Sequence, residues 1–123
     1  MQTRGRLARW AFGLAVVAQL VALYWPRPVE TGTTLPVDKL VHAAIFGAVL
    51  WTGGRAGVPV RLLAAVLAVH AGLSEVVQGT LLDRDGNVPD ALADLAGLVV
   101  AWILLRRGRS GATPARAGGP DRG

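Results

Sequence analysis

Four apolar segments separated by short polar loops are the feature that most limits what this chain can fold into. The segments cover approximately residues 8–25, 38–53, 61–82 and 89–106. An α-helix needs about 20 apolar residues to cross a bilayer, and three of the segments approach that length. Hydrophobic residues make up 52% of the chain and charged residues 17%, the balance of a membrane protein rather than a soluble one. The sequence therefore predicts an all-α, integral membrane four-helix bundle over residues 1–107.

The ends of the chain and the second segment qualify this prediction. A basic start before an apolar run also occurs in signal peptides, but the run is long for one and no small-residue cleavage site follows. We therefore expect residues 8–25 to form an uncleaved first span. Segment 38–53 is short, and fits if Asp38 and Lys39 lie in the headgroup region or if its helix is partly re-entrant. Residues 108–123 are rich in Gly, Ala, Arg and Pro, which predicts a disordered cytoplasmic tail.

Composition also limits the chemistry and the kinds of binding partner that this chain can have. The chain has no cysteine, so neither disulfides nor thiolate chemistry can operate. Its net charge of +5 comes mostly from arginines that stand just outside the apolar segments, which favours a membrane flank over nucleic-acid binding. We expect the lipid bilayer as a partner and no nucleic acid, whereas protein partners stay open. Small residues such as Ala93, Gly97 and Ala101 form a ridge that lets helices pack closely in lipid.

The placement of Lys and Arg predicts the orientation of the segments. Ten of these residues lie in the N-terminus, the middle loop and the C-terminal tail, and three lie in the other two loops. Because basic loops stay in the cytoplasm, both termini are expected there. The start of the second segment, the end of the third and the start of the fourth then meet at the extracytoplasmic face.

Polar side chains inside the apolar segments gather at that face and are the candidate site. The catalytic candidates are Asp38, His42, Glu75, Asp90 and Asp94, and the binding candidates are Lys39, Gln78 and Arg84. Ionisable residues at membrane depth are by default candidates for function. Asp38 and His42 are four residues apart and share a helix face. They form either an N-cap with a held imidazole or an acid–base pair that can also ligate metal.

For the other candidates, a purely structural role is an alternative to a functional role. A buried Glu75 is costly unless it is paired, protonated or used, whereas Gln78 needs only a hydrogen bond between helices. Asp90 suits the first turn of a helix, where the dipole favours negative charge. Asp94 lies beside the small-residue ridge and is expected to point into the bundle. Arg84 is either a salt-bridge partner or a ligand-binding group.

His70 lies one turn deeper than Ser74, which can reach it, and we expect this imidazole to be packed rather than chemical. No metal motif with strong spacing exists. His42, Glu75, Asp90 and Asp94 can gather a cation only if three helices cooperate, so no metal is predicted and the cofactor stays open. A nucleophile elbow and a phosphate-binding loop are also missing.

The ordered set of polar residues resembles the VanZ-like family. The motif residues are Asp38-Lys39-x-x-His42, Glu75-x-x-Gln78, Arg84 and Asp90-x-x-Ala93-Asp94-x-x-Gly97. The resemblance as a whole extends from residue 38 to about residue 105, which is most of the folded part. The family more often has Asn at the position of Asp94. The resemblance implies a small multi-span protein of the bacterial inner membrane, from a family named for a member associated with glycopeptide resistance, and does not by itself predict resistance here.

Three functions remain open at this stage. The first is a polar pocket at the extracytoplasmic face that binds or acts on a cell-envelope molecule, such as a lipid-linked cell-wall precursor. The second is a non-enzymatic scaffold whose polar residues lock the bundle. The third is ion or proton transport, although the acids cluster at one depth. Whether the chain is an enzyme is not decided by its sequence.

Overall fold

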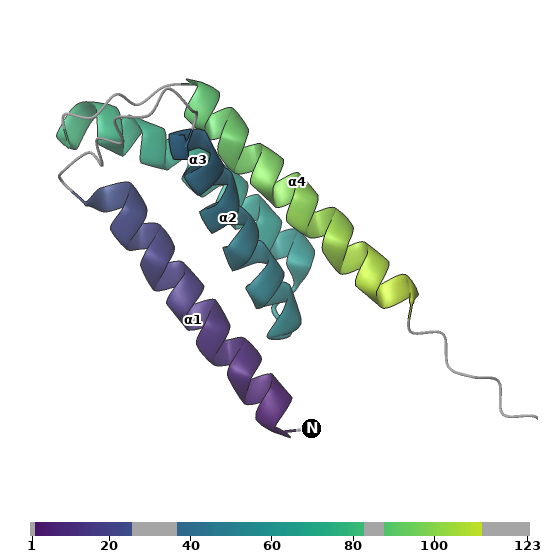
Figure 1. The fold of residues 1–123 in the computed structure, drawn as a ribbon. Helices are drawn as coiled ribbons and strands as arrows, with labels where there is room; N and C mark the ends of the chain where they lie inside the picture. Colours follow the sequence, from purple (N-terminus) through teal and green to yellow (C-terminus); the bar gives the residue numbers. More distant parts are fainter. Residues whose placement is uncertain (1, 26–36, 83–87, 112–123) are drawn as a thin grey trace, which may run out of the picture.

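Four α-helices lie side by side in a computed structural model that describes residues 2–25, 37–82 and 88–111. The helices are α1 (Gln2–Tyr24), α2 (Val37–Arg55), α3 (Val60–Leu81) and α4 (Val88–Ser110), and no strand occurs in the described residues. Successive helices run in opposite directions (Figure 1). The prediction of an all-α helical bundle is confirmed.

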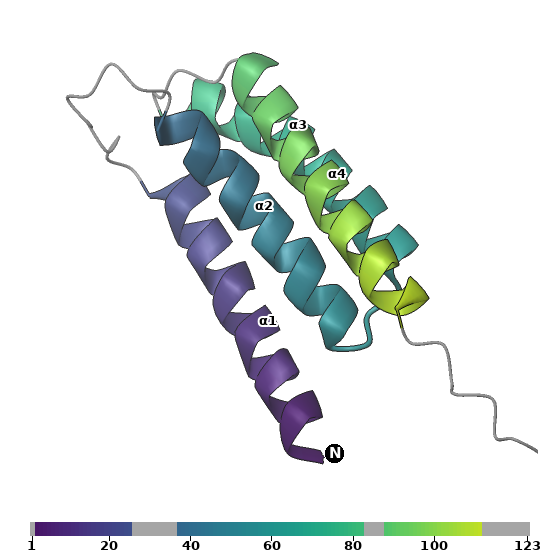
Figure 2. The same cartoon turned by 45° about the vertical axis from the view of Figure 1, so that its right-hand side comes forward.

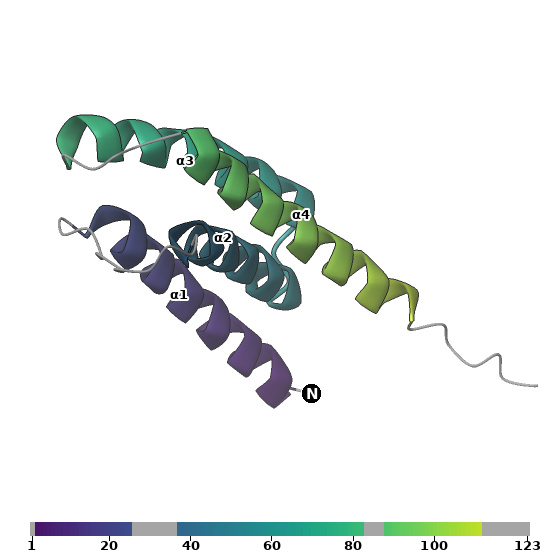
Figure 3. The same cartoon turned by 45° about the horizontal axis from the view of Figure 1, so that its top comes forward.

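Helix α2 lies at the centre of the bundle. It packs between α1 and α4 and also contacts α3 (Figure 2). Phe46, Val49 and Leu50 of α2 are fully buried and meet Leu23 of α1 and Leu98 of α4 in the core. Figure 3, from a different direction, shows α1 and α4 on opposite sides of α2. A helix enclosed in this way presents less of its surface to the surroundings than the other three do.

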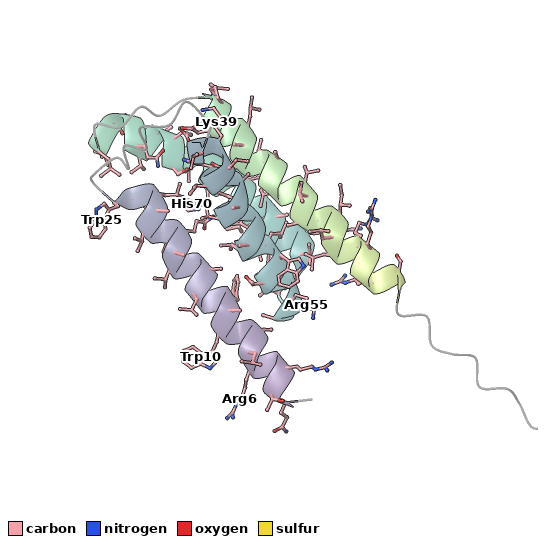
Figure 4. All side chains as sticks on the ribbon, in the orientation of Figure 1. Arg6, Trp10, Trp25, Lys39, Arg55 and His70 are labelled. Carbon is pink, nitrogen blue, oxygen red and sulfur yellow. The ribbon has the colours of Figure 1, made fainter. Side chains whose placement is uncertain are left out.

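The outer faces of the helices are apolar. Large side chains such as Trp10, Leu62 and Val99 are mostly exposed, and Trp10 and Trp25 point away from the bundle (Figure 4). Exposed apolar surface on this scale is disfavoured in water but is what a lipid-facing surface requires. Helices α1, α3 and α4 are long and apolar enough to cross a membrane. The described residues thus have the surface of a membrane protein.

Helix α2 is the exception among the four predicted spans. It is not among the three helices of the described residues that are long and apolar enough to cross a membrane. Its first turns carry Lys39 and His42, and the segment was already the shortest of those predicted. The span assignment of α2 stays a prediction, whereas its helical structure is observed.

The helix ends differ from the predicted segments by a few residues. Helix α1 already begins at Gln2, and α4 continues to Ser110, so residues 108–110 are helical rather than part of a tail. The apolar run marks the part of a helix that suits lipid, but residues such as Gln and Arg continue the backbone helix beyond it. The rest of the predicted tail, residues 112–123, lies outside the described residues. Between α2 and α3 the chain turns through Gly57, whose φ of 95° suits glycine.

Helices α2 and α4 approach each other most closely at glycines. A Cβ atom added to Gly97 would overlap the backbone carbonyl of Ala43, and one added to Gly47 would lie 3.0 Å from the Gly97 carbonyl oxygen. Small residues at helix interfaces permit this spacing in lipid. The predicted small-residue ridge is therefore a contact surface, with Gly97 at its centre and Ala101 buried.

Candidate functional site

Polar side chains gather at the end of the bundle where α1 and α3 finish and α2 and α4 begin. Each of the four helices takes part in hydrogen bonds there. Two bonds join α2 to α4, and two others join α1 to α3. Figure 4 shows Lys39 and His70 toward this end and Arg6 and Arg55 toward the other. The expectation that distant polar motifs meet at one end is confirmed for the described residues.

The central feature is a buried pair formed by His42 of α2 and Asp94 of α4. Nδ1 of His42 lies 2.8 Å from Oδ1 of Asp94, and the side chains are 6% and 0% exposed. When Asp94 is ionised its carboxylate can only accept, and Nδ1 of His42 then donates this bond. The second oxygen of Asp94, Oδ2, is buried and has no hydrogen-bond partner among the described residues. Buried polar atoms are nearly always satisfied, so this oxygen requires an explanation.

Glu75 of α3 brings a second carboxylate to this pair. One ligand-capable atom each from His42, Glu75 and Asp94 lies within 4.8 Å of the other two. Glu75 is half-buried, whereas the other two are buried. Three helices therefore each contribute one group to a cluster that we call the His–Glu–Asp cluster. The cooperation of three helices that the sequence left open is present.

Lys39 and Asp90 form an ion pair beside the cluster. Nζ of Lys39 lies 3.2 Å from Oδ1 of Asp90, joining the first turn of α2 to the first turn of α4. The Asp90 side chain is buried, whereas that of Lys39 is 43% exposed. Lys39 thus offers positive charge to the surroundings while it satisfies a buried acid.

His70 lies deeper in the bundle and belongs to a packing contact. Its Nε2 shares a hydrogen bond of 2.7 Å with the Tyr24 hydroxyl, and its ring centroid lies 5.8 Å from those of Tyr24 and Phe46. This placement agrees with the expectation of a packed imidazole. Ser74 does not reach it, because its hydroxyl donates to the carbonyl oxygen of Ala71 in its own helix.

Gln78 ties α3 to the end of α1. Its Nε2 donates to the backbone oxygen of Leu23 at 2.9 Å, and Leu23 stands in the last turn of α1, where carbonyls have no partner within the helix. The predicted binding residue thus has a structural bond that fully accounts for it. The sequence could place Gln78 on the face of Glu75 but could not reveal a backbone acceptor 55 residues away.

Replacing Gln78 with alanine is expected to lower the free energy of unfolding by about 0.6–2 kcal/mol, the range for one interhelical hydrogen bond in a membrane. Thermal unfolding of the purified protein in detergent measures this loss. Thr80→Ala is the matched control, because the Thr80 hydroxyl donates only to Val76 of its own helix. Equal effects of the two substitutions would contradict a linking role for Gln78.

Two predicted site residues lie outside the described part. Arg84 is in segment 83–87, and the side chain of Asp38 is likewise not described, although its backbone belongs to α2. The predicted pair of Asp38 and His42 therefore stays a prediction. What the sequence missed is the bond from His42 to Asp94, which spans 52 residues and leaves no local signal.

Two of the hollows along the described helices differ in their lining. An apolar groove of about 470 Å³ runs between α2 and α4, from Ala43 and Gly97 beside the polar end toward Trp51 and Leu104. A basic hollow of about 520 Å³ lies at the opposite end, lined by Arg61, Arg106 and Arg109 among other residues. The groove thus begins next to His42 in the sequence and continues along apolar surface.

Comparison with protein-family models, curated proteins and solved structures finds no match for this chain in any of the three. The residues and geometry described above are consequently the basis for a functional assignment.

Proposed function

We propose that this chain is a membrane protein whose polar end binds the head group of a lipid-linked molecule of the bacterial cell envelope. The observation that carries the proposal is the enclosed pair of His42 and Asp94, with an Asp94 oxygen that lacks a partner among the described residues. Ionisable groups are expensive at membrane depth and mark functional sites there. The resemblance of the motif residues to the VanZ-like family supports the same assignment.

The charges at this end suit a polar head group with an anionic part. Among the described residues, Lys39 is an exposed cation at this end and Glu75 is half-buried, so an incoming ligand meets these two residues first. His42 and Asp94 lie behind them in the bundle. A lysine ammonium binds phosphate as a point charge, and carboxylates accept hydrogen bonds from sugar hydroxyls.

The groove between α2 and α4 supports a lipid-linked ligand over a water-soluble one. It begins at Ala43 and Gly97, next to His42 and three residues from Asp94, and its lining is almost entirely apolar. A hydrocarbon chain that follows this groove keeps its head group at the polar end. Tail and head of one amphiphile are thus both accommodated.

The chemistry available at the site is proton transfer. A neutral imidazole held by a carboxylate at Nδ1 is a general base at Nε2, and the carboxylate stabilises the charged ring that forms. If the ligand is turned over, His42 accepts the proton of the attacking group and Asp94 orients the ring. Orientation follows from the basic residues, which put both termini in the cytoplasm and the polar end at the outer face of the inner membrane.

Lipid carried through purification tests the proposal. Extraction of the chain into polymer-bounded nanodiscs, followed by mass spectrometry, measures phosphate-bearing envelope lipids per protein. We expect Lys39→Ala and Glu75→Gln to reduce a specific lipid by about tenfold or more, because one charge-assisted hydrogen bond contributes about 1.5–3 kcal/mol. His70→Gln, outside the cluster, is the control. Identical lipid content in all four proteins would exclude a head-group site.

A scaffold without a ligand is the second candidate. The hydrogen bonds that join α2 to α4 and α1 to α3 favour it, because each locks two helices together. In that case Lys39→Ala and Glu75→Gln lower the melting temperature but leave lipid content per molecule unchanged. Thermal unfolding of the same nanodisc samples separates the two functions.

A further inference from the structure

We infer that His42, Glu75 and Asp94 form a binding site for a divalent metal ion, with Zn²⁺ as the ion that fits best. The inference deepens the proposed function and rests on it in one respect, namely that both use the same polar end. It adds an ion to a site for which the sequence alone assigned no metal ligands and left metal binding open.

The geometry is that of three convergent ligands. One ligand-capable atom from each residue lies within 4.8 Å of the other two. Zinc bound by nitrogen and oxygen at about 2.0–2.2 Å in a tetrahedral site holds its ligand atoms roughly 3.5 Å apart. The largest separation exceeds this value by at most about 1.3 Å, which side-chain rotations close. Each residue comes from a different helix, so binding also fastens α2, α3 and α4 together.

The unsatisfied oxygen of Asp94 is an independent indication of a ligand. Asp94 is 0% exposed, and its Oδ2 has no hydrogen-bond partner among the described residues although Oδ1 accepts from His42. A buried carboxylate oxygen without a partner is costly. A metal ion beside it supplies a partner for Oδ2.

Charge balance points the same way. The cluster brings two carboxylates and one imidazole to a site at membrane depth, where net charge is disfavoured. The cation that the described residues place nearby, Lys39, is engaged by Asp90. A divalent ion neutralises both carboxylates of the cluster when His42 is neutral, which is also the state in which an imidazole ligates metal. The ion takes the place of the hydrogen bond between His42 and Asp94: Nδ1 ligates it and the ring proton is carried by Nε2.

The ligand set selects the ion. Imidazole suits zinc, and carboxylate oxygen is accepted by it at similar bond lengths. Three protein ligands leave a fourth position open, as in catalytic rather than structural zinc sites. That position suits a water or an oxygen of the bound head group. The metal and the head group would then share one site.

A titration with Zn²⁺ tests the inference directly. The full chain is purified without a histidine tag, treated with a chelator and titrated in nanodiscs, with bound zinc measured by elemental mass spectrometry and affinity by calorimetry. We expect one Zn²⁺ per chain. His42→Ala and Glu75→Gln should weaken zinc binding by about 100-fold or more. Loss of a residue that only contacts a metal ligand weakens binding about 10–100-fold, and loss of a ligand itself should cost at least as much. His70→Ala is the control, because His70 is the only other histidine in the chain.

The outcomes separate this inference from the proposed function. Stoichiometric zinc that is lost in His42→Ala and Glu75→Gln but kept in His70→Ala supports the metal site. Zinc that fails to bind wild type, or binds all variants alike, overturns it. If wild type binds no zinc while Glu75→Gln still loses lipid, the metal site is wrong and the head-group site stands. If zinc binds as expected but lipid content never changes, the metal site stands and the head-group function is wrong.

Discussion

Replacing His42 with alanine is expected to lower the free energy of unfolding by about 3 kcal/mol or more, because it leaves a buried charged group without its hydrogen bond. The cause is the enclosed carboxylate of Asp94, which loses its hydrogen bond at Oδ1 while Oδ2 already has no partner among the described residues. Neither water nor lipid head groups reach a side chain that is fully buried. Unfolding in mixed detergent micelles, followed by circular dichroism, measures the loss.

A double-mutant cycle isolates the pair from other effects of the substitution. Asp94→Leu removes the charge and keeps the side chain buried, so the double variant His42→Ala/Asp94→Leu should lose less stability than the sum of the two single losses. We expect a coupling of about 1–3 kcal/mol, within the range for residues in direct contact. Thr80→Ala, which alters an exposed hydroxyl, should change stability by no more than about 0.5 kcal/mol. Strictly additive losses would contradict the contact between His42 and Asp94.

Replacing Gly97 with leucine is expected to be at least as damaging, with a loss of about 3 kcal/mol or more. Overpacking of a core usually costs 1–3 kcal/mol because flexible side chains can shift. At Gly97 the obstacle is the backbone of Ala43, which cannot rotate away. Helices α2 and α4 must therefore separate, and the polar pairs between them are expected to lengthen or break. Thermal unfolding and yield in the membrane fraction both report the change.

Glycines with open surroundings provide the control. A Cβ added at Gly13 of α1 or at Gly72 of α3 meets nothing within 4 Å. Alanine at either position should therefore be neutral or stabilise the helix, by up to about 1 kcal/mol, because glycine is the poorer helix former. Gly97→Ala should instead destabilise the protein. If alanine at Gly97 behaves like alanine at Gly13, the close approach of α2 and α4 is wrong.

The helices and their shared polar end could be predicted because both depend on local or additive properties of the sequence. An apolar run long enough for a span identifies a helix whatever its neighbours are, and the positions of Arg and Lys fix which ends lie together. The helix ends were less accurate, as the extension of α4 to Ser110 illustrates. Polar residues continue a backbone helix beyond the apolar run, so hydropathy does not mark where it stops.

The partner of His42 could not be predicted, because it depends on how α4 is rotated against α2. Spacing along the sequence offered Asp38 as a neighbour of His42, which stays a prediction, and gave no sign of Asp94, which the structure brings to the Nδ1 atom of His42. The contact between Ala43 and Gly97 explains why. It fixes the rotation of the two helices one residue from His42 and three residues from Asp94, so the acid on the adjoining turn meets the imidazole. Such a contact can be recognised only in a three-dimensional structure.

Labelling of single cysteines from the two sides of the membrane tests most directly whether the helices bring these groups to one membrane face. The chain has no cysteine of its own, so Trp25→Cys, Pro59→Cys, Val88→Cys and Ser110→Cys each report one helix end. We expect a membrane-impermeant maleimide to label cysteines at positions 25 and 88 in intact spheroplasts, and those at 59 and 110 only after permeabilisation. Labelling of positions 59 and 88 from the same side would mean that α3 does not cross, and would contradict a polar end assembled at one membrane face.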